Sequence, residues 1–325
     1  MIKNICIVTN LKAGNKNYSK AYYENIIQDF NKKISQSIEH IVLQDIPNKY
    51  DLLDHVKKAD MLVINGGDGT VQNILTLLCK NIKIDEIPLI AILPVGSTNL
   101  IALDVGAIKS KKNVLKKFIE RFNQGETQIN IEKRALVHIK NEETLIDEYG
   151  FFIGLAQFYK SSVLFNEKLR KYKLAGPIGI IIVTIYNFYC IFIKNKFDKN
   201  SDEVIIKINS KIYSFTPFLL CITTLKKIFT KKTIITQENT NNKHIFLLIV
   251  KNKAKHIIRN MYSFFTGKKS KYFNEKDGFM VIHNKNIELS GADGIAIDGE
   301  LFKIDKTKDK LYFERGPLIS FVVLN

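Results

Sequence analysis

The sequence contains few cysteines and few histidines, and neither residue type forms a metal or redox motif. Its four cysteines lie far apart without a CxxC pair, which excludes a zinc knuckle or a thioredoxin-type site. The six histidines are also scattered, so no histidine-based metal site is indicated. Scattered cysteines fit a reducing cytosol. The N-terminal segment MIKNICIVTN is too short an apolar run for a secretory signal and fits a buried strand. We therefore expect a cytoplasmic protein.

Several widespread nucleotide-binding and catalytic motifs are absent as well. The sequence has no G-x-x-x-x-G-K-[ST] loop, no G-x-G-x-x-G, no H-E-x-x-H and no nucleophile elbow. It also has no internal repeat and no low-complexity tract. What remains is an ordinary globular composition, with 46% hydrophobic and 25% charged residues. A length of 325 residues predicts about two domains.

The positive charge is large and unevenly distributed. The 49 basic and 32 acidic residues give a net charge of +17. Residues 1–128 hold 17 basic and 13 acidic residues, a net of +4, and the rest of the chain supplies the remaining +13. Such an excess indicates a polyanionic partner, either nucleic acid or an anionic membrane surface. The alternative is compositional drift, because Lys, Asn and Ile are abundant throughout the chain.

The two parts of the chain also differ in hydrophobic periodicity. Before residue 128, wholly apolar strands alternate with helical patterns, which predicts a parallel sheet covered by helices on both faces. After residue 128, short runs of period 2 predict antiparallel strands of a second, mostly β domain. The first part is expected to have strands at residues 5–9, 38–43, 61–65 and 88–93 and helices at residues 18–34, 51–58, 70–79 and 111–123. The second part is expected to have strands at residues 128–131, 135–139, 204–208, 246–250, 279–283 and 287–289.

One segment of the second part needs a separate interpretation. Residues 174–193 contain no charged residue, and lysines flank both ends, so the segment is long enough to span a bilayer. However, Gly176 and Pro177 open it and Asn187 interrupts it. We expect a buried or membrane-facing helix, with a membrane span as the alternative.

The strongest local signal is the run Gly66-Gly67-Asp68-Gly69-Thr70, between a predicted strand and a predicted helix. Its three glycines allow positive φ and let backbone N–H groups approach a phosphate closely. The N-terminus of the following helix also favours an anion. Asp68 could act through a magnesium ion or accept a proton from an attacking hydroxyl. The run therefore predicts a phosphate-binding turn, and the alternative is an ordinary glycine-rich turn.

A second polar turn, Gly96-Ser97-Thr98-Asn99, follows the next predicted strand. Its polar side chains are suited to capping the helix that begins there. They also lie at the carboxyl end of a parallel strand, where such sheets bind nucleotides. The two roles are compatible.

A third polar motif, Asp298-Gly299-Glu300, follows the strand-like residues 294–297. Its two carboxylates could supply a general base. Asp-Gly is also a common turn pair. The residue types alone leave both interpretations open.

Together these motifs resemble the diacylglycerol kinase catalytic family, which includes bacterial diacylglycerol kinases and sphingosine kinases. The matching residues are the turn at Asn10 with Gly14, GGDGT at 66–70, LPVGSTNLIA at 93–102 and DGE at 298–300. They occur in the family's order and cover nearly the whole chain. GGDGT alone is shared with NAD kinases, whereas PVGSTN followed by a late DGE is more specific.

The resemblance implies an α/β nucleotide-binding domain, of the type shared by NAD kinases and diacylglycerol kinases, followed by a mostly-β sandwich domain with the active cleft between them. We expect residues 1–128 and 129–304 to form the two domains, with a tail from about residue 305 to 325 returning to the first. The resemblance also implies an ATP-dependent lipid kinase that uses Mg²⁺. Its acceptor would be the hydroxyl of diacylglycerol or a related lipid.

The functional positions of the family carry over by matching residues. Those implied to hold the nucleotide are Asn10, Gly66, Gly67, Asp68, Gly69, Thr70, Gly96, Ser97, Thr98 and Asn99. The carboxylates of Asp298, Glu300 and Asp68 are implied to share the metal and proton work. The first two rank ahead of Asp68 as the general base.

Two departures from the family pattern keep alternatives open. Asn73 stands where many family members carry a glutamate, and residues 237–240 lack the Asp-Gly pair that helps hold a structural magnesium in bacterial members. Both differences favour a non-catalytic lipid-binding relative, whereas the intact carboxylates favour an active enzyme. An NAD kinase is the second alternative, although no Asn-Glu or Asn-Asp pair follows a later strand convincingly.

A lipid substrate implies contact with a membrane, which we expect at the inner face through the second domain. Residues 226–271 hold twelve basic residues and one acidic residue, Glu238. An apolar stripe bordered by lysines predicts an interfacial helix there. The alternative is a helix packed on the β domain. No nucleic-acid partner is expected, because no recognised module accompanies the charge. The stripe consists of Ile257, Ile258, Met261, Tyr262 and Phe265.

Overall fold

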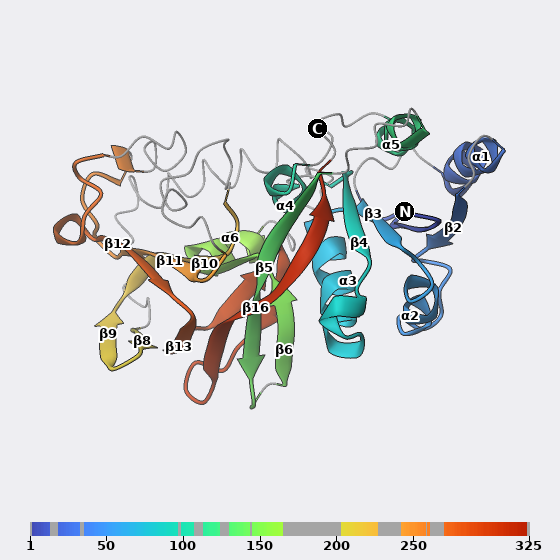
Figure 1. Ribbon diagram of the computed structural model, residues 1–325. Coiled ribbons are helices and arrows are strands. Elements are labelled where there is room, and N and C mark those ends of the chain that lie inside the picture. Colours follow the sequence, from blue (N-terminus) through green and yellow to red (C-terminus); the bar gives the residue numbers. More distant parts are fainter. Residues whose placement is uncertain are drawn as a thin grey trace. The chain divides into compact units, whose positions relative to one another are not determined.

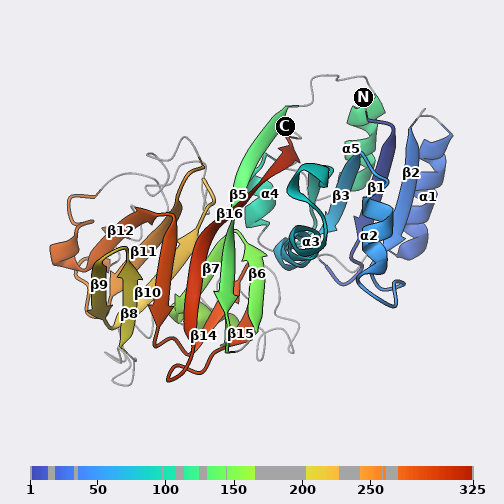
Figure 2. The same ribbon diagram turned by 60° about the horizontal axis from the view of Figure 1, so that its bottom comes forward.

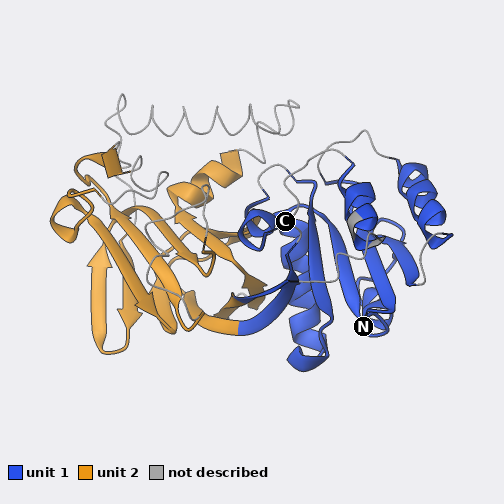
Figure 3. Cartoon of the chain, turned by 45° about the horizontal axis from the view of Figure 1, so that its top comes forward, with its two compact units in different colours: residues 1–134, 317–325 blue, residues 135–316 orange. Residues whose placement is uncertain are grey.

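The computed structural model divides the chain into two compact units, which Figure 3 shows in different colours. Unit 1 consists of residues 1–134 and 317–325, and unit 2 of residues 135–316. The described residues are 2–13, 19–32, 36–96, 99–106, 113–123, 130–143, 145–164, 203–226, 242–257, 259–260 and 270–323. The segments 174–193 and 237–240, most of the predicted apolar stripe, Gly14, Ser97 and Thr98 therefore lie outside the described residues.

Unit 1 is built from alternating strands and helices. Its strands are β1 (Asn4–Thr9), β2 (Ser37–Val42), β3 (Met61–Gly66) and β4 (Leu89–Pro94). Its helices are α1 (Lys20–Asn31), α2 (Asp51–Val56), α3 (Asp68–Asn81), the short 3-10 turn η1 (Ile84–Glu86), α4 (Leu100–Asp104) and α5 (Val114–Asn123). Two further strands, β5 (Ile131–Asn141) and β16 (Lys310–Val322), each contribute residues to both units.

The four strands of unit 1 form a parallel sheet in the order β2-β1-β3-β4. The end of β16 adds to β4, also in parallel, with Phe321 opposite Ile90. Figure 1 shows α1 and α5 on one face of this sheet and α2 and α3 on the other. The predicted parallel sheet with helices on both faces is confirmed.

The core of unit 1 follows from the apolar strands. Every residue of β3 is buried. On one face of the sheet, Tyr23, Ile27 and Phe30 of α1 join buried residues of α5 and the strands in a single cluster. Burial of each large apolar side chain contributes about 1.5–3 kcal/mol.

Unit 2 is rich in strands. It contains β5, β6 (Ile146–Gly150), β7 (Phe152–Ala156), α6 (Gln157–Leu164), β8 (Val204–Ile208), β9 (Lys211–Phe215), β10 (Pro217–Thr223), β11 (Ile245–Lys251), the 3-10 turn η4 (Glu275–Asp277), β12 (Phe279–Asn284), β13 (Asn286–Ser290), β14 (Gly294–Ile297), β15 (Glu300–Lys303) and most of β16. The predicted class, an α/β part followed by a mostly-β part, is confirmed.

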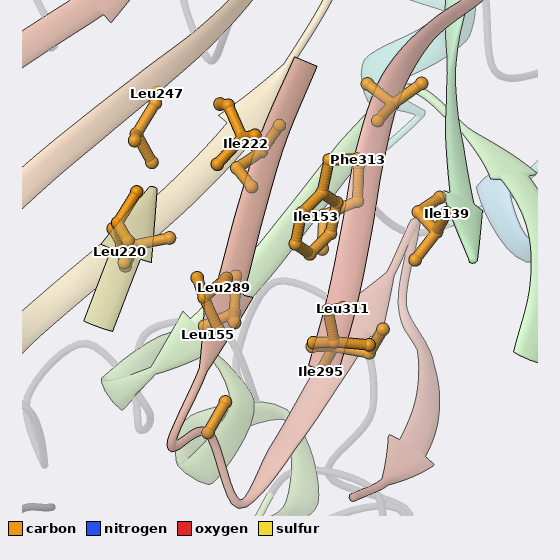
Figure 4. Packing of buried hydrophobic residues seen from close by; sticks show 14 of the residues in the cluster. Ile139, Ile153, Leu155, Leu220, Ile222, Leu247, Leu289, Ile295, Leu311 and Phe313 are labelled. Carbon is orange, nitrogen blue, oxygen red and sulfur yellow. The ribbon is translucent and has the colours of Figure 1, made fainter. Parts of the chain in front are cut away.

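Two sheets of unit 2 enclose one core. In the first, β9, β8, β13 and β16 are neighbours in that order, with β5 on β16 and β6 on β5 (Figure 2). The second has the order β12-β11-β10-β7-β14-β15. Their side chains form a shared cluster, which makes the unit a β-sandwich. Figure 4 shows part of this cluster, including Ile139, Leu289, Leu311 and Phe313 from the first sheet and Ile153, Leu155, Leu220, Ile222, Leu247 and Ile295 from the second.

Three details of the sequence prediction are wrong. Residues 131–141 form one strand, β5, where two short strands were expected. Residues 246–250 were expected to alternate, but all of them are buried. The burial of successive residues shows that both faces of β11 are covered, and strands covered on both faces do not alternate. Helix α6, which packs on β7, β10 and β14, was not predicted.

The described cysteines should be chemically inert in the folded protein. Burial raises the pKa of the Cys6, Cys79 and Cys221 thiols to about 12, and Glu39 adds to the effect at Cys6. Because the thiolate is the nucleophile, alkylation at pH 8 should be about a thousandfold slower than for an ordinary cysteine. Peptide mapping after timed labelling checks this, with the denatured protein as control. Fast native labelling of Cys6 or Cys221 would contradict it.

Candidate functional site

The first predicted turn is a tight junction between β3 and α3. Gly66 ends the strand, Gly67 is the residue before the helix, and Asp68 already lies in the first turn of α3. The helix was expected to begin only at Thr70. An aspartate in the first turn is favourable because of the helix dipole.

The glycines of this turn serve close packing. The expectation of positive φ is wrong: among the described glycines, only those at 106, 278, 291 and 299 have it. A Cβ atom on Gly66 would lie 2.6 Å from the Cβ of Thr70. A side chain at position 66 would therefore collide with the first turn of α3.

The second predicted turn packs directly on the first. A Cβ atom on Gly96 would lie 2.7 Å from the Cα of Gly67. The strands before them are also neighbours, since Gly66 of β3 is opposite Pro94 of β4. The two glycine turns, about thirty residues apart in the sequence, thus meet backbone to backbone.

Substitution of Gly96 by alanine should separate the two turns. The new Cβ would approach backbone atoms, which cannot rotate away, so we expect a loss of stability of about 1–3 kcal/mol and weaker nucleotide binding. Gly67→Ala is the graded comparison, since its Cβ would lie 3.3 Å from the Gly96 Cα and should cost less. Thermal unfolding and calorimetric titration with an ATP analogue measure both effects. Equal effects of the two variants would contradict the packing argument.

Asp68 uses its carboxylate to cap another helix. Its two oxygens accept hydrogen bonds from the backbone N–H groups of Leu100 and Ile101, each at 3.1 Å. These are the first residues of α4, and such N–H groups have no partner within a helix. Asp68 therefore fixes α4 to the first glycine turn.

Asn99 does not cap α4 with its side chain, contrary to expectation. It has a left-handed backbone with φ of 53°, and its Nδ2 donates to the carbonyl oxygen of Gly96 at 2.8 Å. Its Oδ1 is buried and, within the part of the chain that the structure describes, has no hydrogen-bond partner.

Asn10 lies next to the first glycine turn. Its Nδ2 donates to Thr70 Oγ1 at 2.7 Å. Its Oδ1 accepts from the backbone N–H of Lys12 at 2.9 Å and from Gln44 Nε2 at 2.8 Å. Gln44 Oε1 in turn accepts from the backbone N–H of Leu11 at 3.0 Å. The Gln44 side chain therefore bonds both the Asn10 side chain and the backbone that follows it.

The sequence analysis did not select Gln44 and Asn65 as candidate site residues. Both lie at the carboxyl ends of parallel strands, where such sheets bind ligands. Gln44 comes two residues after β2, and Asn65 is the penultimate residue of β3. Asn65 is buried; its Nδ2 donates to Thr9 Oγ1, and its Oδ1 has no partner among the described residues. The signal that could have found them is a polar side chain at a strand's carboxyl end.

The third motif lies in unit 2 and forms a two-residue hairpin turn between β14 and β15. Asp298 and Gly299 both have positive φ, 47° and 97°. This is the pattern of a type I′ turn, for which Asp-Gly is a preferred pair. The turn interpretation of these two residues is therefore right.

The Asp298 carboxylate ties this turn to the start of β7. It accepts hydrogen bonds from the backbone N–H groups of Phe151 at 2.8 Å and Phe152 at 2.9 Å. Its own N–H donates to the carbonyl oxygen of Phe152 at 2.9 Å. This bonding supports the turn and β7, and it occupies the carboxylate that was ranked as a catalytic candidate.

Glu300 differs from its neighbour. It is exposed at the start of β15. The described residues offer its side chain no hydrogen-bond or ion-pair partner. Of the two carboxylates in the motif, Glu300 is the one free to meet a substrate.

The site in unit 1 is suited to phosphate. It combines the N-terminus of the fourteen-residue helix α3 with two glycine turns at the carboxyl edge of a parallel sheet. The structure brings together Asn10, Gly66, Gly67, Asp68, Gly69, Thr70, Gly96 and Asn99. No group of three or more His, Cys, Asp or Glu side chains that could hold a metal occurs among the described residues.

Comparison with known proteins identifies a family for the first part of the chain. The sequence profile of the diacylglycerol kinase catalytic domain matches residues 4–129. No curated protein matches the sequence.

Solved structures show the same fold over the full length. A diacylglycerol kinase from Bacillus anthracis str. Sterne is 16% identical with a TM-score of 0.63, and the match covers 99% of this chain and 97% of that one. A candidate diacylglycerol kinase from the same organism is 14% identical with a TM-score of 0.64, covering 99% of this chain and 95% of that one.

Proposed function

Residues 4–129 belong to the diacylglycerol kinase catalytic family, and we propose that the protein is an ATP-dependent lipid kinase. It transfers the γ-phosphoryl group of ATP to the hydroxyl of diacylglycerol or a related lipid. The observation that carries this proposal is the contact of Gly96 with Gly67, which joins two glycine turns beside a helix N-terminus. A site of this kind favours a polyphosphate.

The nucleotide phosphates bind at the first turn of α3. Backbone N–H groups of the two turns neutralise charge on the transferring group, which is the main catalytic requirement of phosphoryl transfer. Asn10 and Thr70, already bonded to each other, line the same turn.

Glu300 is the proposed general base. The lipid oxygen forms a bond to the γ-phosphorus while the bond from that phosphorus to the bridging oxygen of ADP breaks. The hydroxyl proton passes to the Glu300 carboxylate, which is exposed and free of described partners. The role of Asp298 is structural: its hydrogen bonds to Phe151 and Phe152 hold the turn that carries Glu300.

The residues present fit a magnesium ion that enters with the nucleotide. Such an ion is held by one or two carboxylates together with substrate phosphates and water, so a dedicated three-ligand cluster is not required. When bound, Mg²⁺ supplies positive charge against the phosphate oxygens. Asp68, in the first turn of α3, is the carboxylate proposed to hold it.

We also propose peripheral docking on an anionic membrane through unit 2. Among the described residues, no helix is long and apolar enough to cross a membrane. The predicted apolar stripe is not supported at its described end, since Ile257 is buried. The support comes from cations around Tyr272: Arg259 and Lys271 each lie 5.1 Å from its ring centre, and the His256 ring lies 4.0 Å away.

Removal of these cations should weaken membrane binding. Each basic residue near an anionic surface contributes about 1 kcal/mol, so the Arg259→Gln/Lys271→Gln variant should bind vesicles containing phosphatidylglycerol about thirtyfold more weakly. The matched control is Lys57→Gln/Lys58→Gln, which removes two exposed charges from unit 1. Co-sedimentation at low and high salt measures the effect. Salt-independent binding, or equal binding to neutral vesicles, would contradict docking by charge.

The proposed activity is tested by incubating the protein with γ-labelled ATP and a lipid extract. A labelled lipid that is absent from a Glu300→Gln reaction supports the proposal, and mass spectrometry identifies the acceptor. Label in no lipid, with intact ATP binding, would favour a non-catalytic lipid-binding relative. Label transferred to NAD would favour an NAD kinase.

A further inference from the structure

Helix α4 depends on contacts outside itself. It has only five residues, and a helix of that length is unstable alone. Asn99, the residue before it, provides no side-chain cap. The N–H groups of Leu100 and Ile101 instead donate to Asp68, the carboxylate of the phosphate-binding turn. The position of α4 and the position of Asp68 are therefore linked.

The other end of α4 is held by Arg134. Asp104, the last residue of the helix, would be unfavourable there without a partner, because a carboxylate opposes the helix dipole. Arg134 Nε donates to Asp104 Oδ2 at 2.7 Å, and Nη2 donates to the Asp104 carbonyl oxygen at 3.2 Å. The side chains are 4% and 0% exposed, so this is a buried ion pair.

Arg134 is itself fixed from the opposite side. Its Nη1 donates to Glu132 Oε2 at 2.7 Å and to the Lys133 carbonyl oxygen at 3.1 Å. Burial by itself lowers the pKa of Arg134, but Asp104 and Glu132 more than offset this and hold the pKa above its ordinary value. The guanidinium is charged, and its fork of N–H groups donates to acceptors on both sides.

We propose that Arg134 is a positioning residue for nucleotide binding, an inference that rests on the proposed function. It holds α4 through Asp104, α4 holds the Asp68 carboxylate through two N–H groups, and Asp68 lies in the phosphate-binding turn. Arg134 is also the last residue of unit 1 on β5, and that strand continues into unit 2. The residue that anchors the phosphate-binding turn thus lies on a strand shared by both units.

The test combines binding and hydrogen exchange in Arg134→Gln and Arg134→Lys. We expect Arg134→Gln to bind a non-hydrolysable ATP analogue with Mg²⁺ about tenfold more weakly, as for coupled neighbouring sites. Arg134→Lys, which keeps the charge and loses the fork, should fall between this variant and wild type. Combining Arg134→Gln with Asp68→Asn should add little to either single loss. In the absence of nucleotide, amides of residues 66–70 and 99–104 should exchange faster in Arg134→Gln.

Two controls separate positioning from general destabilisation. Lys133→Gln removes the neighbouring exposed charge, and Val56→Ala opens the unit 1 core in α2, away from the site. Both should retain wild-type nucleotide affinity. The proposal is overturned if Val56→Ala weakens binding as much as Arg134→Gln does, or if exchange in Arg134→Gln rises only near residues 104 and 134. If Arg134→Gln does not fold, Arg134→Lys carries the same comparison. If wild type binds no nucleotide, the proposed function fails, and exchange at residues 66–70 still decides the positioning role.

Discussion

Glu300→Gln is expected to reduce turnover by a factor on the order of 10² to 10⁴, the usual contribution of a positioned base. Nucleotide affinity and thermal stability should stay close to wild type, because Glu300 is exposed and has no partner in the described part of the chain. Steady-state kinetics with the identified lipid, together with thermal unfolding, measures both quantities.

Asp298→Asn provides the contrast within the same turn. Its amide offers one oxygen where the carboxylate accepts two N–H groups, so one buried donor loses its partner. We expect a stability loss of about 1–3 kcal/mol, with any loss of rate following from it. Glu275→Gln, an exposed glutamate elsewhere in unit 2, is the neutral control. Normal turnover by Glu300→Gln would show that Asp298-Gly299-Glu300 is a structural turn and that Glu300 is not the base.

Asp68→Asn should lose both turnover and stability. Stability should fall because Asp68 caps α4 with two hydrogen bonds. Hydrogen bonds to a charged group contribute about 1.5–3 kcal/mol, so the loss of one should be measurable. Turnover should fall by a factor on the order of 10² or more.

The matched control for this variant is Asp85→Asn, which changes an exposed aspartate in η1. It should leave both quantities unchanged. Denaturant unfolding and single-turnover kinetics report stability and chemistry separately. If Asp68→Asn unfolds like wild type, the capping role is wrong; if it turns over like wild type, the catalytic role is wrong.

The fold of unit 1 was largely predictable because its signals are local. Apolar runs such as Met61–Gly66 are buried on both sides, and the helices between them show a clear apolar face. Unit 2 was harder to predict. Its inner strand β11 is apolar throughout, and β7 and α6 follow each other directly in a stretch of mixed character. The boundary between strand β7 and helix α6 becomes evident only from the packing of α6 on the sheet.

The site shows a different limit of sequence reasoning. The residues at the strand ends were recognisable, but the partners of their side chains were not. Asp68 bonds residues 32 and 33 positions away, and Asp298 bonds residues 147 and 146 positions away. The sequence does not show that these carboxylates accept hydrogen bonds from backbone N–H groups so far along the chain. Three-dimensional contacts are needed to distinguish Asp298 from Glu300.

The end of β16 has a consequence for how the chain acquires its structure during synthesis. Phe321 and Val322 are buried in unit 1, where the strand pairs with β4. On the ribosome, these residues emerge only after the whole of unit 2. Until then β4 has an unpaired edge, which is a template for aggregation. A fragment that stops at residue 134 would keep that edge permanently, so unit 1 cannot be obtained intact by cutting the chain once.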